Sequence, residues 1–357
     1  MFSTFLKSFR ILLLPVALLY WLAIALRNWM YDKKIFPSTS FGLPIICIGN
    51  LSVGGTGKSP MVEYLVSTLK DRFQTATLSR GYKRRTKGYA LADDNSTALD
   101  IGDEPMQFHL KFPGVAVAVG EERIVAIPQL LHERPSTEVI ILDDALQHRA
   151  ITAGLNILLT DYNNLFTKDF YLPTGDLRDL KSSYKRADII VVTKCKPDLN
   201  TEEAATIREE INPGKEQHIF FTSIQYGSPY HIISNKEYKI YKKSEVLLVA
   251  GIANPAPLKK MLEEQSKTYY LSHFADHHIF TIDDLKEIKK RFEKIDARQK
   301  IILTTEKDAV RLIKFREVLH DLPLYVIPIR HHFLFEKEKA FNTIVTNFIT
   351  NFKREEH

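Results

Sequence analysis

Hydrophobic residues fall in short runs along most of the chain, and these runs alternate with stretches in which they recur at helical spacing. Residues 44–49 form an apolar run that leads into a glycine-rich stretch, and residues 61–73 follow with apolar positions three and four apart. This order predicts a strand, a loop and a helix. Further buried strands are predicted at 75–79, 115–119, 139–142, 156–160 and 188–193. The alternation is typical of an α/β fold with a mostly parallel sheet and helices on both faces.

A second set of alternating elements begins near residue 245. An apolar strand there is followed by a helix at 256–265, strands at 300–303 and 324–327, and a last helix at 336–352. Between the two sets, the stretch around Gly227-Ser228-Pro229 predicts a domain boundary. The predicted parts are an N-terminal apolar helix at 1–35, a larger α/β domain at 36–225, and a smaller α/β domain at 226–357 whose last helix could pack back on the larger one.

The N-terminal segment carries a membrane signal with several interpretations. Residues 11–26 are apolar and uncharged, and sixteen helical residues span about 24 Å, less than the roughly 30 Å of a hydrocarbon core. Pro15 is expected to interrupt the first turns. Basic residues flank this run: Lys7, Arg10, Arg27, Lys33 and Lys34. A spanning helix, a signal peptide cleaved near Ala23-Ile24-Ala25, a helix in one leaflet and a helix buried in protein all fit, and we favour the helix in one leaflet.

Composition and charge narrow the class of protein. The 357 residues leave room for two domains, and 45% hydrophobic with 26% charged residues excludes a disordered chain and a multi-span membrane protein. The net charge is +6, and the first 35 residues hold five Lys and Arg against one acid. The positive charge therefore gathers where a helix would meet anionic lipid. Cys47 and Cys195 stand in apolar runs with no C-x-x-C partner, which predicts buried thiols in a reducing compartment.

A glycine-rich loop between the first predicted strand and helix carries the clearest chemical signal. Residues 49–59 read GNLSVGGTGKS. Backbone N–H groups in such a loop, with the helix N-terminus, surround phosphate oxygens. The residues predicted to bind the nucleotide are Val53, Gly54, Gly55, Thr56, Gly57, Lys58 and Ser59. Lys58 would contact the β and γ phosphates and Ser59 a magnesium ion. The usual spacing asks for Gly at position 52, where this chain has Ser52, but Gly54 and Gly55 can supply the turn.

The strand predicted at 139–142 ends in two acids, Asp143 and Asp144. An acid at the carboxyl end of a strand beside the phosphate loop holds Mg²⁺ directly or through water. The pair could instead cap the next helix. Loop and acids together predict ATP and Mg²⁺ as cofactors, and because ATP is a cytoplasmic cofactor they argue against export and against the signal peptide.

Phosphoryl transfer to a hydroxyl also needs a proton acceptor and nearby cations. Asp103 and Glu104 stand in the motif GDEP, which predicts a turn, where acids are also common for structural reasons. Residues 80–87 hold five cations, which serve either a phosphorylated group or solubility. In Asp276-His277-His278, an Asp-oriented catalytic histidine is more plausible than a two-histidine metal site, although a lone motif of this kind is more often structural. The pair His331-His332 is a weaker candidate.

Motifs along nearly the whole chain resemble, in order, the tetraacyldisaccharide 4'-kinases of lipid A biosynthesis. They are GNLSVGGTGKSP, LSRGYKRR, GDEP, LDDALQHR, LPTGDLRD, VVTKC, GIANP, FADHHIF and LTTEKDAVRL. The resemblance implies a P-loop enzyme with two α/β domains and the active site between them. It implies transfer of the γ-phosphate of ATP to the 4'-hydroxyl of a tetraacylated glucosamine disaccharide 1-phosphate, forming lipid IVA. It also implies work at the cytoplasmic face of the inner membrane.

The resemblance also implies residue roles. The family's phosphate loop matches residues 54–59, its magnesium-binding acids match Asp143 and Asp144, and its general base matches Asp103. His277 or His278 matches the histidine that assists the base, and we favour His277 because it follows Asp276 directly. Further polar positions that line the site match Arg80, Glu104, Gln147, His148 and Arg178.

The effect of two departures from the family pattern remains open, and so do two rival functions. Ala145 stands where the family commonly has Gly, and Asp179 where Glu is usual. Thr193-Lys194 loosely resembles a base-recognition strand, so a GTPase-like switch is one rival, and a non-catalytic, membrane-bound nucleotide-binding subunit is the other. The basic clusters lack interleaved aromatic residues, so we expect no nucleic-acid partner, and we expect a monomer.

Overall fold

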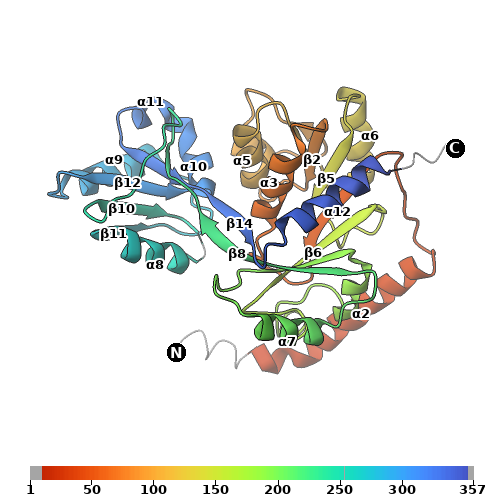
Figure 1. Ribbon diagram of the computed structural model, residues 1–357. Coiled ribbons are helices and arrows are strands. Elements are labelled where there is room, and N and C mark those ends of the chain that lie inside the picture. The colour runs from red at the N-terminus through yellow and green to blue at the C-terminus, as the bar shows by residue number, and fades with distance from the viewer. Residues whose placement is uncertain (1–9, 253, 353–357) are drawn as a thin grey trace.

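The computed structural model describes residues 10–252 and 254–352, which build two β-sheets (Figure 1). The larger sheet has the order β14-β8-β7-β6-β1-β5-β2-β4-β3. Its edge strands β14 and β3 are antiparallel to their neighbours, and the strands between them pair in parallel. Its strands are β1 (Ile45–Asn50), β2 (Thr75–Ser79), β3 (Ala90–Leu91), β4 (Ala116–Val119), β5 (Val139–Asp143), β6 (Leu155–Asp161), β7 (Ile189–Thr193), β8 (His218–Tyr226) and β14 (Ile329–Phe333).

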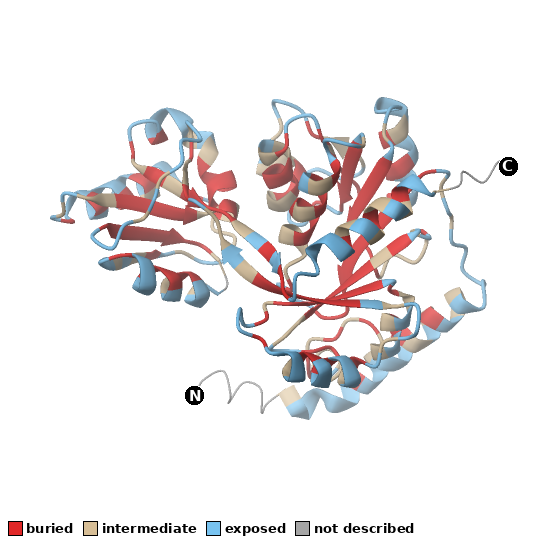
Figure 2. Cartoon of the chain, viewed as in Figure 1, coloured by how far each residue is buried: buried red, intermediate tan, exposed pale blue. Residues whose placement is uncertain are grey.

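Helices cover both faces of this sheet. α3 (Lys58–Leu69), α5 (Asp103–Lys111) and α12 (Glu338–Thr350) bury apolar side chains in one core layer. α6 (Arg123–Glu133) and α7 (Thr201–Ile211) bury theirs in the other. The central strands are therefore buried on both sides, which is why they read as continuous apolar runs (Figure 2). Short helical turns complete this part: α4 (Ala98–Ile101) and η2 (Lys181–Arg186).

The smaller sheet has the order β11-β10-β12-β13-β9, parallel except for β9 at its edge. Its strands are β9 (Tyr230–His231), β10 (Glu245–Ala250), β11 (Thr268–His273), β12 (Lys300–Thr305) and β13 (Leu324–Ile327). α8 (Ala256–Gln265) covers one face, and α9 (Ile282–Glu293) with α10 (Glu306–Leu312) covers the other. η3 (Ile313–Phe315) and α11 (Arg316–Leu319) follow α10.

The chain crosses between the two sheets twice. It leaves the larger sheet after β8 and returns from the smaller one through β14, which pairs with β8 (Figure 1). The last helix, α12, then buries Phe341 and Val345 in the core layer that also contains α3. It therefore packs on the larger sheet, as the sequence analysis allowed. The domain limits at residues 36–225 and 226–357 stay a prediction.

The N-terminal apolar segment forms η1 (Ile11–Leu13) and α2 (Leu14–Asp32). Among the described residues, this 22-residue stretch is the one helix long and apolar enough to cross a membrane. Pro15 lies in the first turn of α2, directly after the 3₁₀ turn η1, so the regular α-helix begins next to it and its missing N–H costs no helical hydrogen bond. Much of the surface of this helical stretch is exposed (Figure 2). Among its apolar side chains, Leu12 in η1 is 72% exposed and Leu19 in α2 is 66% exposed. Lys7 lies outside the described residues.

Both cysteines are buried and free, as the sequence predicted. Burial raises the pKa of Cys47 and of Cys195 to about 12, so neither thiol ionises near neutral pH.

Candidate active site

The glycine-rich loop connects β1 to α3 and supplies the N-terminus of that helix. Gly54 and Gly57 have φ angles of 106° and 87°, a region in which a side chain would strain the backbone. Ser52 is buried, forms an isolated antiparallel bridge with Leu177, and does not have a positive φ. Glycine is therefore needed at positions 54 and 57 and not at 52, so the departure at Ser52 leaves the loop geometry intact.

Side chains from two strands hold the end of the loop. Asn50 Nδ2 donates to Thr56 Oγ1 at 2.9 Å, and Thr193 Oγ1 donates to the Thr56 carbonyl oxygen at 2.8 Å. Lys58 Nζ lies 3.4 Å from Asn50 Oδ1 and 3.7 Å from Asp144 Oδ1. The Lys58 ammonium group is thus held over the loop, where a phosphate would lie.

His331, which the sequence ranked as a weak candidate, also holds the loop. From β14, its Nε2 donates to the Gly57 carbonyl oxygen at 2.9 Å, and its Nδ1 accepts from Thr222 Oγ1 at 2.9 Å. Burial lowers the pKa of His331 to about 4, so the ring is neutral and can serve both contacts with one tautomer. The strand that returns from the smaller sheet therefore supports the phosphate loop directly.

His331→Ala is expected to raise KM for ATP severalfold and to lower kcat less, because it frees the Gly57 carbonyl without removing a group that contacts phosphate. The measurement is steady-state kinetics with ATP varied. His332→Ala is the control, since His332 follows on the same strand with an exposed side chain. Thermal melting separates a loosened loop from lost folding, and an unchanged KM in a folded His331→Ala variant would contradict the role.

The two acids after β5 differ in their surroundings. Arg178 forms hydrogen bonds with both carboxylate oxygens of Asp144. Burial alone would raise the pKa of Asp144, but the hydrogen bonds with Arg178 and the charge of Lys58 outweigh it and lower the pKa. Asp143 is buried, and its Oδ1 has no hydrogen-bond partner among the described residues. Burial, with the charges of Glu104 and Asp144, raises the pKa of Asp143 to about 7. Asp143 is therefore the acid with an oxygen available to a cation.

The turn at Asp144 also accounts for the Ala145 departure. The residue with a left-handed backbone is Asp144, at a φ of 50°, and Ala145 does not have a positive φ. Alanine is therefore tolerated where the family commonly has glycine. Asp179 is buried and binds Asn28, Ser183 and Arg186 at 2.8–2.9 Å, so the shorter side chain is built into a local network.

Asp103 begins α5, so the turn predicted for GDEP is instead a helix start, with Gly102 at a φ of 96° before it. His277 Nδ1 donates to Asp103 Oδ2 at 2.9 Å from the loop after β11, and Arg311 on α10 binds the same carboxylate. Burial would raise the pKa of Asp103, but Arg311 and, to a smaller degree, His277 outweigh it and lower the pKa. The carboxylate is therefore ionised at neutral pH. No signal in the sequence had pointed to a role for Arg311.

The two histidines of the FADHHIF motif point to different partners. His277, at a φ of 62°, follows β11 of the smaller sheet and contacts Asp103, which starts α5 on the larger sheet. His278 Nε2 lies 2.9 Å from Asp284 Oδ2, within the capping box that starts α9. The geometry therefore joins His277, and not His278, to Asp103.

The remaining predicted site residues differ in their contacts. Gln147 Nε2 donates to the Asn50 carbonyl oxygen at 2.7 Å, at the start of the phosphate loop. His148 has a buried Nε2 without a partner among the described residues, and burial together with Arg123 lowers its pKa. Glu104 accepts from Lys307 Nζ at 3.1 Å. Arg80 is exposed.

The basic stretch at 80–87 divides into two kinds of residue. The side chain of Arg84 is only 2% exposed and forms an ion pair with Glu121 at 2.6 Å, which is a structural contact. Arg80, Lys83, Arg85 and Lys87 are exposed and leave their charges to solvent or to a ligand.

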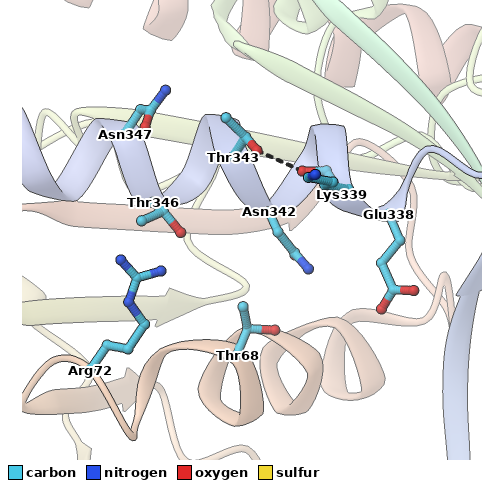
Figure 3. Close-up of a pocket in the computed structure, with 8 residues that line it drawn as sticks. All are labelled: Thr68, Arg72, Glu338, Lys339, Asn342, Thr343, Thr346 and Asn347. Carbon is cyan, nitrogen blue, oxygen red and sulfur yellow. Dashed lines mark hydrogen bonds between the residues drawn. The ribbon is translucent and has the colours of Figure 1, made fainter.

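A separate groove lies between α3 and α12 (Figure 3). It is lined by Thr68 and Arg72 near the end of α3 and by Asn342, Thr346 and Asn347 on α12. Because α3 starts at the phosphate loop and Thr68 stands near its opposite end, the groove is remote from the residues described above.

A phosphate loop connects a strand of a parallel sheet to a helix, and a buried acid stands at the end of the neighbouring strand β5. Together these features define the class of P-loop nucleotide-dependent phosphotransferases. Comparison with known proteins narrows this class. The family model for tetraacyldisaccharide-1-P 4'-kinase (LpxK) matches residues 9–350, and the chain belongs to this family.

Relatives and a solved structure agree with this assignment. The chain is 42% identical to a tetraacyldisaccharide 4'-kinase of Bacteroides thetaiotaomicron, covering 94% of this chain and 92% of the relative. It is 45% identical to that of Flavobacterium johnsoniae, covering 95% and 97%. A crystal structure of LpxK from Aquifex aeolicus in complex with ATP has a TM-score of 0.75 and 28% identity, and covers 96% of this chain and 99% of that chain.

The predicted fold and family are therefore confirmed, and the chain is a kinase of lipid A biosynthesis that uses ATP. This outcome disfavours both rivals, the GTPase-like switch and the non-catalytic subunit.

Proposed function

We propose that the protein transfers the γ-phosphate of ATP to the 4'-hydroxyl of a tetraacylated glucosamine disaccharide 1-phosphate, forming lipid IVA. The observation that carries this proposal is the contact of His277 Nδ1 with Asp103 Oδ2 at 2.9 Å, which joins the two sheets beside the phosphate loop. The negative charge of Glu104, the residue after Asp103, contributes to the raised pKa of Asp143. The start of α5 therefore lies close to the acid that ends β5. A hydroxyl at Asp103 would thus be near a phosphate held by the loop.

We assign ATP to the loop from Val53 to Ser59, with backbone N–H groups around the phosphates and Lys58 on the β and γ oxygens. The open space above Gly54 and Gly55, where an added Cβ would meet nothing within 4 Å, supports close approach of a phosphate to the backbone.

Mg²⁺ fits the residues present. The buried, unpartnered Oδ1 of Asp143 supports it as the ligand, together with the Ser59 hydroxyl. Asp144 is engaged by Arg178 and Lys58, which supports an orienting role for it. Held there, Mg²⁺ would supply positive charge that offsets the negative charge of the phosphate groups.

Asp103 is the proposed general base. Its Oδ2 accepts from His277 and Arg311, whereas Oδ1 accepts from Arg311 alone and keeps a lone pair for the hydroxyl proton. The proton of the 4'-hydroxyl passes to this oxygen as the hydroxyl oxygen attacks the γ-phosphorus in line with the leaving oxygen of ADP. His277 donates to the carboxylate and orients it, so both sheets contribute to the site.

Other residues receive supporting roles in this proposal. Arg80 and the exposed cations near it are suited to the phosphorylated headgroup, and Arg178 and Gln147 to the order of the loop. Glu104 and His148 line the site. His278, turned to Asp284, is better suited to the start of α9 than to the substrate.

For the N-terminal helix we propose a position in one leaflet at the cytoplasmic face of the inner membrane. Polar contacts tie the N-terminal segment to the protein near both of its ends: Arg10, just before η1, to Asp176 at 3.0 Å, and, on α2, Arg27 to the Gln147 carbonyl at 2.7 Å and Asn28 to Asp179 at 2.8 Å. A transmembrane orientation would break these contacts. The exposed apolar face, with basic residues at both ends, supports contact with anionic lipid.

Leu19→Glu is expected to lower binding to vesicles that contain anionic lipid several-fold, because it puts a charge on the exposed apolar face of α2. Activity on a short-chain, soluble acceptor should stay near the parental value. Vesicle sedimentation and a kinase assay measure the two. The control is Val318→Glu, which puts the same charge at an exposed apolar position on α11, where 47% of Val318 is accessible. This variant should bind the vesicles as the parent does. Equal loss in both variants would contradict the role of α2.

The central experiment is ATP-dependent phosphorylation of a tetraacylated disaccharide 1-phosphate in detergent by the purified chain. Phosphate should appear on the 4' position with ATP, and much less with GTP. Hydrolysis of nucleotide without any lipid acceptor, with a preference for GTP, would overturn the proposal in favour of a switch.

A further inference from the structure

A single short helix of the smaller sheet, α10, contacts the start and the end of α5. Lys307 pairs with Glu104 at 3.1 Å, Glu306 pairs with Lys111 at 2.5 Å, and Arg311 binds Asp103. These contacts join residues about two hundred positions apart in the chain. The proposed base is therefore held by the same helix that docks the two sheets together.

Arg311 meets Asp103 in a two-point geometry. Its Nη2 donates to Oδ2 at 2.7 Å and its Nε donates to Oδ1 at 3.1 Å. Arg311 is itself buried, with 6% of its side chain exposed, and its Nη1 lies 3.4 Å from Oδ1 of Asp308 one turn earlier. Asp308 in turn accepts from the Gly251 N–H at 2.9 Å and from Thr305 Oγ1 at 2.7 Å. Asp308, itself held by two hydrogen bonds, thus helps to fix the position of the Arg311 guanidinium that binds Asp103.

This arrangement constrains the base more than the histidine contact does. A single hydrogen bond from His277 lets a carboxylate rotate about χ2, whereas a two-point guanidinium contact fixes the plane of the carboxylate. With Arg311 in place, the free lone pair of Oδ1 has one direction. Arg311 Nη2 also lies 3.1 Å from His277 Nδ1, and since both are donors they converge on the shared Oδ2 rather than bind each other.

We propose that Arg311 is a positioning residue for the phosphotransfer step: it fixes the plane of the Asp103 carboxylate, aims Oδ1 at the acceptor hydroxyl and keeps the carboxylate ionised. The proposal rests on the assignment of Asp103 as the base. The charged and titratable groups that face Asp103 are Arg311 and Asp308 from α10, His277 and Asp276 from the loop after β11, and Glu104 with its partner Lys307.

The sign of the pH effect follows from these contacts. The cation of Arg311 favours the ionised form of Asp103 and lowers its pKa, so its removal raises that pKa. The base must be ionised to accept a proton. The acid limb of the kcat profile should therefore move to higher pH in Arg311→Gln.

The test compares Arg311→Gln and Arg311→Lys in the full-length protein with ATP and a lipid acceptor. At neutral pH Arg311→Gln should lose on the order of 10- to 100-fold in kcat, as expected for a misaligned catalytic group, with KM for ATP unchanged and the acid limb shifted upward. Arg311→Lys keeps the charge and loses the two-point contact, so we expect a loss of about threefold to tenfold with the acid limb unmoved. Arg291→Gln is the control, because Arg291 forms an exposed pair within α9.

Three results would overturn the proposal. The first is a parental kcat and pH profile in Arg311→Gln, and the second is a parental kcat in Arg311→Lys, which decides the question even if the Gln variant does not fold. The third is an equal loss in both variants with an unmoved acid limb, which would mean that Arg311 only joins the two sheets. If Asp103→Ala is inactive while the Arg311 variants are parental, this inference fails and the proposed function stands. If Asp103→Ala keeps full turnover, the assignment of the base fails with it.

Discussion

Replacing Asp103 with alanine is expected to lower kcat by a hundredfold or more while KM for ATP changes little. The carboxylate is the group proposed to accept the hydroxyl proton, and general-base catalysis contributes about 10²- to 10⁴-fold. Among the residues that the structure describes, the side-chain hydrogen bonds of Asp103 go to His277 and Arg311, neither of which belongs to the phosphate loop. ATP binding should therefore survive its loss. Steady-state kinetics with each substrate varied in turn gives both constants.

Two further variants sharpen this test. Asp103→Asn keeps the shape of the side chain and an oxygen that can accept from Arg311, but it cannot take up the proton, so its kcat should be as low as that of Asp103→Ala. Asp94→Ala, at an exposed position in the same segment, should behave as the parent. Near-parental turnover of a folded Asp103→Ala variant would remove Asp103 from the role of base.

The parts of the site that could be predicted from sequence are those whose signal is local. The phosphate loop, the strand before it and the helix after it are contiguous, and Asp143 ends an apolar strand that is recognisable alone. The N-terminal helix is a further local case. The helical stretch begins at Ile11, as the apolar run predicted, and changes from a 3₁₀ turn to an α-helix at Leu14, next to Pro15.

The parts that could not be predicted depend on contacts between distant positions. Arg311 and Asp103 are 208 positions apart, and His331 and Gly57 are 274 apart. Arg311 stands in the motif LTTEKDAVRL, which helped to indicate the family but gave no signal of its partner. The strand β14 reads IRHHF, and its two histidines interrupt the apolar pattern by which a strand is recognised. One of them, His331, is buried, and its ring nitrogens form hydrogen bonds with Thr222 and with the phosphate loop.

The GDEP segment was missed for a related reason. Its glycine and proline favour a turn in isolation, but proline is well tolerated in the first turn of a helix, and α5 is stabilised by burial of Met106 and Phe108. The local sequence therefore fits either structure, and tertiary packing decides in favour of the helix. This choice matters for function, because it puts Asp103 at a helix start facing α10.

Lys58→Ala is expected to impair both ATP binding and turnover. The Lys58 side chain is 17% exposed, and its ammonium group is held by Asn50 and Asp144 at the phosphate loop, where it would offset charge in the ground state and in the transition state. We expect kcat/KM for ATP to fall on the order of 10²- to 10³-fold, as for the loss of one charge-stabilising donor. Equilibrium binding of ATP and single-turnover kinetics measure the two contributions separately.

The matched control is Lys70→Ala, since Lys70 caps the other end of α3 and pairs with the exposed Asp71. Normal ATP affinity in a folded Lys58→Ala variant would contradict the assignment of the phosphate loop. The contrast with Asp103 is the stronger argument. A change on the nucleotide side should raise the dissociation constant of ATP together with the barrier, whereas a change on the acceptor side should raise the barrier alone. If Lys58→Ala and Asp103→Ala gave the same pattern, the division of the site into a phosphate loop from one sheet and a base held by the other would be wrong.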